Sequence, residues 1–153
     1  MHCPSHFREE RQEVLHGLIR AHPLATLVTS GSGGLMANLV PFSLHAGGDH
    51  GILRAHLGRS NRQVEALREG ADVLVIFQGP ESYVSPAWYA SKAEHGKVVP
   101  TWNFAMVQAR GKARDIDDPA WIGAQLEELT GNHENGRAHP WTVTDAPEDF
   151  TTA

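Results

Sequence analysis

The segment Ala71-Asp72-Val73-Leu74-Val75-Ile76-Phe77-Gln78 decides how the rest of the 153-residue chain is arranged. Residues 73–77 are five apolar residues in succession, and they form the longest apolar run in the sequence. A short run of this kind, rich in β-branched residues, is typical of a strand buried on both faces. We therefore expect residues 71–78 to be the central strand of a sheet. The run is far shorter than the roughly 20 apolar residues that a membrane-spanning helix needs.

Strand patterns on the N-terminal side of this segment predict a β-hairpin and a third strand. Residues 24–30 are rich in β-branched residues, and a glycine-rich turn at 31–34 joins them to a second strand at 35–45. Pro41 has no N–H to give to a strand ladder, so it indicates a sheet edge or a bulge. The third strand is expected at 52–57.

Two strand patterns on the C-terminal side complete the fold class. Residues 83–85 predict a short strand, and alternating residues at 104–113 predict a longer one. Five or six strands at short spacings favour antiparallel pairing. We therefore expect an α+β fold, mainly antiparallel β, in the form of a small closed barrel with flanking helices.

Helices are predicted where apolar residues recur at helical spacing between capping and stop residues. The helix at 60–69 follows directly on the third strand. The first expected helix is 7–21, with Ser5 as N-cap and Pro23 as the stop. The second is 60–69, with Val64 and Leu67 buried and Gly70 as the stop. The third starts at Asp118-Pro119 and ends at Gly131, and its buried residues are Trp121, Ile122, Leu126 and Leu129. A capping-box pattern at 145–148 predicts a further helix start.

The charge of the chain is unevenly distributed. The formal net charge is -5, but residues 115–153 carry nine acidic groups and one basic group, Arg137. Residues 1–114 carry twelve basic and nine acidic groups and are mildly basic. Duplex-DNA binders usually have a clustered basic patch, and here the pI is about 6.0 and no run of Lys or Arg is present. The mild basicity is better matched to a small anion such as a phosphate ester.

Composition and cysteine content indicate a cytoplasmic protein of one domain. The length suits a single domain with a sizeable core. Cys3 is the one cysteine, which excludes an intrachain disulfide and fits a reducing compartment. The N-terminus is polar and acidic, unlike a signal peptide.

Several kinds of chemistry lack their sequence signature. The ten histidines are scattered, and neither the cluster His2, Cys3 and His6 nor the pair His133 and His139 has a recognised metal-ligand spacing. There is no Gly-x-Ser-x-Gly nucleophile motif. The glycine-rich turn at 31–34 lacks the Lys-Ser/Thr ending of a phosphate-binding P-loop.

The link at 56–61, His-Leu-Gly-Arg-Ser-Asn, is the best candidate for an anion site. It lies where a predicted strand leads into a predicted helix, whose N-terminus offers free amides and the positive end of the helix dipole. Arg59 adds a full charge with a planar donor fork, and Ser60 and Asn61 add hydroxyl and amide donors. The alternative is a capped helix with an exposed arginine.

A second cluster combines aromatic and polar residues at 83–89 and 99–104. Large planar side chains beside hydroxyl and amide groups can cover one face of a flat heterocycle. They can equally close a barrel end or form a subunit interface, and the residues alone leave both readings open.

In these segments and others, the chain resembles the PaiB family, the FMN-binding negative transcriptional regulators of the flavin split-barrel superfamily. The resemblance extends in order along nearly the whole chain, and its tryptophan-containing strings are rare. It rests on Pro4-Ser5-His6-Phe7, Pro23-Leu24-Ala25-Thr26-Leu27-Val28-Thr29, Ala37-Asn38-Leu39-Val40-Pro41-Phe42, the link at 56–61, Phe77-Gln78-Gly79-Pro80, the string at 83–89 with Lys92, residues 98–104, Pro140-Trp141 and Asp145-Ala146-Pro147.

The resemblance implies a homodimeric split β-barrel with FMN at the subunit interface. It implies that Arg59, Ser60 and Asn61 hold the phosphate. Its implied ring contacts come from Asn38, Leu39 and Pro41 together with His56, and the pocket is completed by Ser85, Trp88, Thr101, Trp102 and Asn103, some of them from the partner subunit.

The chain also departs from its relatives in two ways. His2 and Phe104 stand where relatives usually have tyrosine. Relatives continue into a further segment with a Gly-Lys-Trp-Lys-Leu-Ser-Gln-Asn-like ending, so the resemblance implies a single domain over 1–153 that lacks the C-terminal segment of the family.

The function that this resemblance favours is an FMN-binding regulator or sensor without catalytic turnover, because only His56 is an evident acid or base near the site. The first alternative is a flavin-dependent oxidoreductase of the reductase or oxidase type. The second is a haem-binding split-barrel protein, although nothing specifies an axial ligand. The family label also implies a DNA partner, which neither the charge nor any motif supports.

Overall fold

The apolar run at 73–77 lies in a long strand, β5 (Asp72–Val84), that is paired on both sides and so is central as expected. The computed structural model describes residues 1–147. Its other strands are β1 (Leu24–Gly31), β2 (Gly34–Pro41), β3 (Ser43–His45), β4 (Ile52–Arg54) and β6 (Thr101–Lys112). Its helices are α1 (Gln12–Ala21), α2 (Gln63–Arg68), α3 (Ser91–His95) and α4 (Pro119–Glu134), with 3-10 turns η1 (Ser5–Phe7), η2 (Pro86–Trp88) and η3 (Val143–Asp145).

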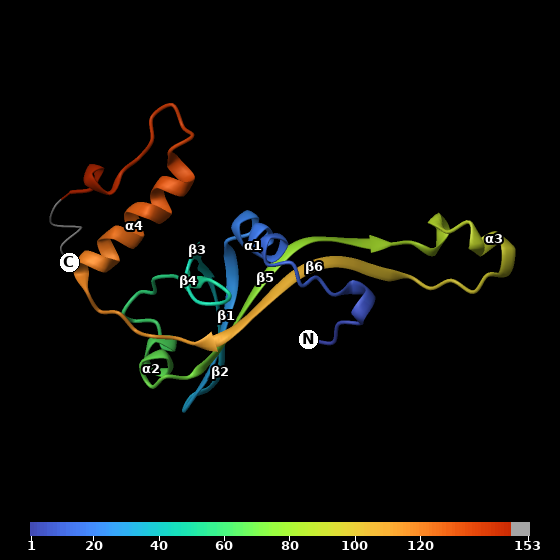
Figure 1. Cartoon of the computed structure of the whole chain (residues 1–153), viewed down its shortest axis with the longest axis horizontal. Coiled ribbons are helices and arrows are strands. Elements are labelled where there is room, and N and C mark those ends of the chain that lie inside the picture. The colour runs from blue at the N-terminus through green and yellow to red at the C-terminus, as the bar shows by residue number, and fades with distance from the viewer. Residues whose placement is uncertain (148–153) are drawn as a thin grey trace.

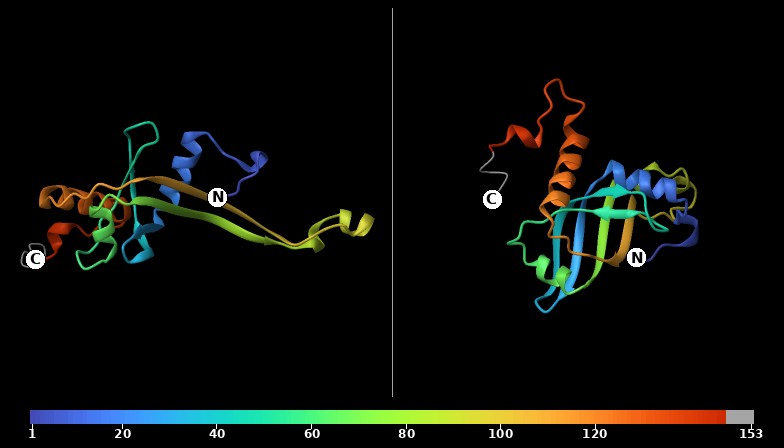
Figure 2. Two further views of the ribbon diagram at one scale, coloured as in Figure 1. Left: turned by 90° about the horizontal axis from the view of Figure 1, so that it is seen from below. Right: turned by 60° about the vertical axis from the view of Figure 1, so that its left-hand side comes forward.

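The strands divide into two antiparallel sheets instead of a single closed ladder. The larger sheet has the order β2-β1-β5-β6, and β3 pairs with β4 in a two-stranded sheet. Figure 2 shows the small sheet crossing one face of the large one. The predicted fold class is confirmed: α+β, mainly antiparallel, with helices at the flanks. Pro41 ends β2, which is an edge strand as its missing N–H predicted.

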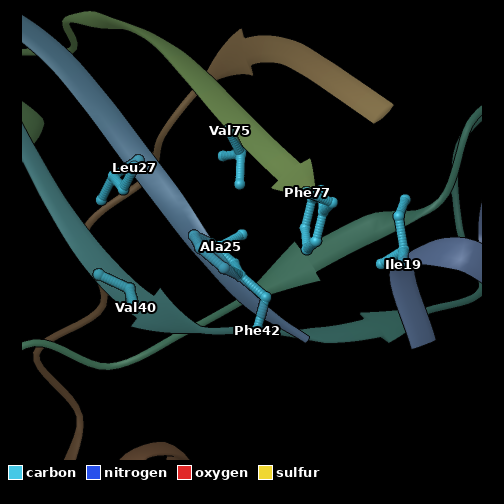
Figure 3. Packing of buried hydrophobic residues seen from close by; sticks show 7 residues of the cluster. All are labelled: Ile19, Ala25, Leu27, Val40, Phe42, Val75 and Phe77. Atoms are coloured by element: carbon cyan, nitrogen blue, oxygen red, sulfur yellow. The ribbon is translucent and has the colours of Figure 1, made fainter. Parts of the chain in front are cut away.

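The core lies between the two sheets and α1. Phe77 is completely buried in β5, and its ring meets that of Phe42 edge-on at 5.8 Å between centroids. The side chains of seven buried apolar residues converge on this space (Figure 3): Ile19, Ala25, Leu27, Val40, Phe42, Val75 and Phe77. Helix α1 covers one side by packing against β3, β5 and β6.

Beyond this body, β5 and β6 continue as a long two-stranded arm that ends at α3 (Figure 1). The strand pairing shifts register between Gln78 and Glu81, at a bulge that contains Gly79 and Pro80. The expected short strand at 83–85 is therefore the far end of β5, and β6 begins at Thr101 instead of 104. Apolar alternation is lost in the arm because both of its faces are exposed.

Helix α1 begins at Gln12, so the prediction of a start at Phe7 with Ser5 as the cap is wrong. Ser5 lies in the separate turn η1, and the side chain of Phe7 is exposed. Glu9 Oε1 accepts the Arg11 N–H at 2.8 Å and holds Arg11 in extended backbone as the N-cap, and the Arg11 carbonyl then accepts the first helical bonds from Val14 and Leu15. The hydrogen bond from Arg11 lowers the pKa of Glu9 to about 2.

The predicted strand at 35–45 is broken in two at Phe42. Its N–H donates to the carbonyl of Pro23 at 2.9 Å, which is the last contact in the β1–β2 register, and its ring turns into the core. Strand β4 ends at Arg54, short of the expected 57. The pairing partner β3 has only three residues, which limits the length of the ladder.

Two further helix boundaries differ from expectation. Helix α2 begins at Gln63, not Ser60, and α4 continues through Gly131 to Glu134 because that glycine keeps helical backbone angles. Asp118 does cap α4, accepting the Ala120 N–H at 2.9 Å. Helix α3 had no sequence signal.

The capping box near the C-terminus begins at Thr142 and not at Asp145 as predicted. Asp145 closes a box opened by Thr142, accepting the Thr142 N–H at 2.7 Å, and therefore ends η3 instead of starting a helix. The rest of the predicted helix, 148 onward, lies outside the described residues. None of the helices within residues 1–147 is long and apolar enough to cross a membrane.

Replacing Phe77 with alanine should destabilise the fold by about 3–5 kcal/mol, because a fully buried ring leaves a cavity. Urea denaturation at fixed protein concentration measures the change. Leu35→Ala is the control, since that side chain is 78% exposed and should change stability by under about 0.5 kcal/mol. Equal losses in both variants would contradict a core centred on β5.

Candidate functional site

The loop at 56–61 joins β4 to α2, and Arg59 projects from it into solvent. The Arg59 guanidinium faces the linker between β6 and α4, where Asp117 accepts two hydrogen bonds: Nη2 to Oδ1 at 2.8 Å and Nη1 to Oδ2 at 3.4 Å. Ser60 is exposed beside it. The exposed arginine of the sequence reading is thus present, together with an acidic partner that the sequence did not reveal.

Two of the predicted site residues, Asn38 and Asn61, are brought together from β2 and from this loop. Asn61 Oδ1 accepts the Gln63 N–H at 2.9 Å, an Asx turn that delays the helix start. Asn38 Nδ2 donates to Gln63 Oε1 at 2.8 Å and lies 3.5 Å from Asn61 Oδ1. These amides are therefore held by hydrogen bonds within the chain.

Gln63 links these groups to the large sheet, and the sequence analysis missed it. The side chain has no exposed surface. Its Nε2 donates to Leu27 O at 3.0 Å, Thr29 Oγ1 at 3.2 Å and Met36 O at 3.3 Å. The predicted buried pair of α2, Val64 and Leu67, is only partly buried, with Leu67 packed against the core, and the fully buried residues of this helix are Gln63 and Ala66.

His56 reaches α4 on the other side of the loop. Its Nδ1 lies 2.9 Å from Oε1 of Gln125, which is 3% exposed. An amide oxygen only accepts, so His56 Nδ1 is the donor in this contact. Among the described residues nothing pairs with Gln125 Nε2, which leaves one buried donor beside His56.

Helix α4 contacts the small sheet through side chains on one of its faces. The Arg54 guanidinium lies 5.8 Å from the centroid of the Trp121 ring, and His45 Nε2 lies 3.2 Å from Glu128 Oε1. With the His56–Gln125 bond, these contacts place the helix beside the loop that carries Arg59.

The remaining predicted residues do not join this group. Leu39 and Pro41 lie on the edge strand β2, where Leu39 is 66% exposed. The others lie along the arm, far from α2 at the opposite end of the molecule in Figure 1: Ser85, Trp88, Thr101, Trp102 and Asn103. One chain therefore forms two separate halves of the predicted site.

The arm presents its aromatic side chains to solvent. Tyr83 and Trp102 are cross-strand neighbours with rings 5.9 Å apart, edge to face. Trp88 is 69% and Trp102 58% exposed, as are the nearby Val99 and Phe104 to a similar extent. The arm extends away from the two sheets (Figure 1), so the cluster does not close the end of a barrel in its own chain. Contact with a flat heterocycle and a subunit interface remain the two predictions for it.

This fold and these residues define a flavin-binding split-barrel protein. The chain belongs to the family described as "Putative FMN-binding domain", whose sequence profile matches residues 1–153. The match confirms the family resemblance and FMN as its cofactor. Within residues 1–147, no three His, Cys, Asp or Glu side chains gather as a metal site.

Particular relatives support the same assignment. The chain is 34% identical over 98% of its length to all of "Uncharacterized protein YKL070W" of Saccharomyces cerevisiae. It is 29% identical over 92% of its length to 65% of "Protease synthase and sporulation protein PAI 2" of Bacillus subtilis. The fold matches the FAD and haem binding protein from Mycobacterium smegmatis with a TM-score of 0.66 at 20% identity, covering 95% of this chain and 63% of that one.

Gln63→Leu should destabilise the chain by about 2–4 kcal/mol, because it leaves Asn38, Thr29 and two backbone carbonyls without their buried partner. Thermal or urea unfolding measures the loss. Gln78→Leu is the matched control on an exposed strand position, with little expected change. A neutral Gln63→Leu would show that the network does not hold the loop.

Proposed function

We propose that the chain binds FMN between two copies of itself and acts as a cytoplasmic regulator or flavin-dependent sensor. The observation that carries this proposal is the separation of the site into two halves. The loop with Arg59 is at one end of the molecule, and the aromatic arm extends from the other. A second copy supplies the missing half if its arm lies against the body of the first.

The residues present fit the chemical groups of FMN. Arg59 offers a planar donor fork and Ser60 a hydroxyl, which suit a phosphate. The buried Gln125 Nε2 is a donor without a partner in the described chain, and it lies beside the half-buried His56. Leu39 and Pro41 add apolar surface on the β2 edge, which suits a flat ring.

The arm supports the dimer half of the proposal. Monomeric proteins seldom expose several large apolar side chains side by side, and such patches mark interaction sites. Here the exposed aromatic residues come from η2 and β6, with Tyr83 of β5 between them. Ser85, Trp88, Thr101, Trp102 and Asn103 would then contact the flavin held by the partner, as the family resemblance implies.

Bound FMN supplies a planar ring that accepts and returns electrons. The chain's own residues hold and orient that ring. We favour sensing over turnover because His56 is hydrogen-bonded to a neutral amide and has no carboxylate partner within the described residues.

The name of the Bacillus relative connects it with protease synthesis and sporulation, which agrees with a regulatory role. Regulation through a protein partner fits the low basicity of the chain better than direct DNA contact.

FMN binding is tested by absorbance of the purified protein and by quenching of flavin fluorescence on titration. Arg59→Ala should weaken binding by about 1.5–3 kcal/mol if it carries a charge-assisted phosphate bond. Arg62→Ala is the matched control, because Arg62 extends toward the β1–β2 turn instead.

The outcomes separate the parts of this proposal. No quenching at tens of micromolar FMN would overturn flavin binding. Unchanged FMN affinity in Arg59→Ala would show that the phosphate does not bind at Arg59.

The dimer is tested by sedimentation. The chain has a mass of 16.7 kDa and should sediment as a particle of twice that mass. Trp102→Ser should shift it toward monomer, because the arm loses a large apolar contact. Trp141→Ser is the control at an exposed tryptophan outside the arm. A monomeric wild type at micromolar concentration would contradict the two-copy site.

A further inference from the structure

The linker between β6 and α4 places acidic side chains against the basic groups around α2. Arg59 Nη2 lies 2.8 Å from Asp117 Oδ1. Arg68 contacts Asp115 Oδ2 at 3.0 Å and Asp117 Oδ2 at 3.8 Å. These three ion pairs join segments about 50 residues apart in the sequence, and Asp117 contacts both arginines.

Asp117 uses the donors that a phosphate would use. A carboxylate and a phosphate both accept two parallel hydrogen bonds from the guanidinium fork, so they compete for one geometry. Asp117 already receives both Nη donors of Arg59. A phosphate that takes the fork must displace this carboxylate, which otherwise lies beside it as a like charge.

The pair is also weak enough to be exchanged. The side chain of Arg59 is 77% exposed and that of Asp117 is 46% exposed. Ion pairs in such settings contribute little net stability because solvent screens them. The Arg68–Asp115 contact does not involve Arg59, so the exchange of Asp117 for a phosphate does not require that contact to break.

We propose that Asp117 is an internal competitor for the flavin phosphate at Arg59 and thereby reduces the preference of the chain for FMN over riboflavin. This rests on the proposed FMN site. Riboflavin has the same ring system without the phosphate, so it leaves the Arg59–Asp117 pair intact. Asp117 therefore lowers affinity for the phosphorylated flavin and leaves the affinity for the other unchanged.

The test is a titration of the full chain with FMN and, separately, with riboflavin. Asp117→Asn should raise the affinity for FMN about two- to fivefold, the range expected from an exposed ion pair, and leave the affinity for riboflavin unchanged. Asp115→Asn is the matched control, since it removes the same charge two residues away but contacts Arg68. Asp115→Asn should change the affinity for FMN clearly less than Asp117→Asn does. Arg59→Ala combined with Asp117→Asn should bind FMN no better than Arg59→Ala alone.

Each outcome bears on one idea. If Arg59→Ala weakens FMN but Asp117→Asn does not tighten it, the competitor is overturned and the FMN site stands. If Asp117→Asn tightens FMN and riboflavin equally, or if Asp115→Asn matches it, the effect is not at the phosphate and the proposal is wrong. If Arg59→Ala leaves FMN affinity unchanged, the phosphate site itself fails and the competitor fails with it.

Discussion

Everything in this molecule depends on β5 being paired on both sides. Its first half has β1 on one side and β6 on the other, and it carries Val75 and the fully buried Phe77 into the core. Its second half has only β6 as a partner and leaves the body as the arm. A single strand thus joins the part that folds by burying apolar surface to the part that keeps such surface exposed.

The same division explains where the sequence was informative. Apolar continuity at 73–77 identified the central strand, in which Val75 and Phe77 enter the core and Leu74 and Ile76 on the other face are partly buried. The Asp118-Pro119 start of α4 was also readable, because a cap acts on neighbours in the chain. The start of α1 was not, because its N-cap is Arg11, which has no capping side chain and is held by Glu9, a surface carboxylate that resembles any other.

The candidate site was readable only in its isolated residues. Arg59 could be named from its loop, but its partner Asp117 is 58 residues away and the contact depends on how β6 returns past α2. Gln63 carried no signal, since a glutamine at a helix start is ordinarily solvated. The family resemblance named the aromatic residues of the arm, while the arm itself, extending away from the loop, required the fold.

The bulge in β5 has a consequence for assembly. Gly79 is buried there, and a Cβ on it would lie 3.1 Å from both the Ala105 carbonyl and a methyl of Leu18. Pro80 next to it has no N–H to continue the ladder. The angle at which the arm leaves the body is therefore set at Gly79 and Pro80. Any molecule that packs along the arm takes its orientation from them, so the symmetry of an assembly can change without any change in its contact surface.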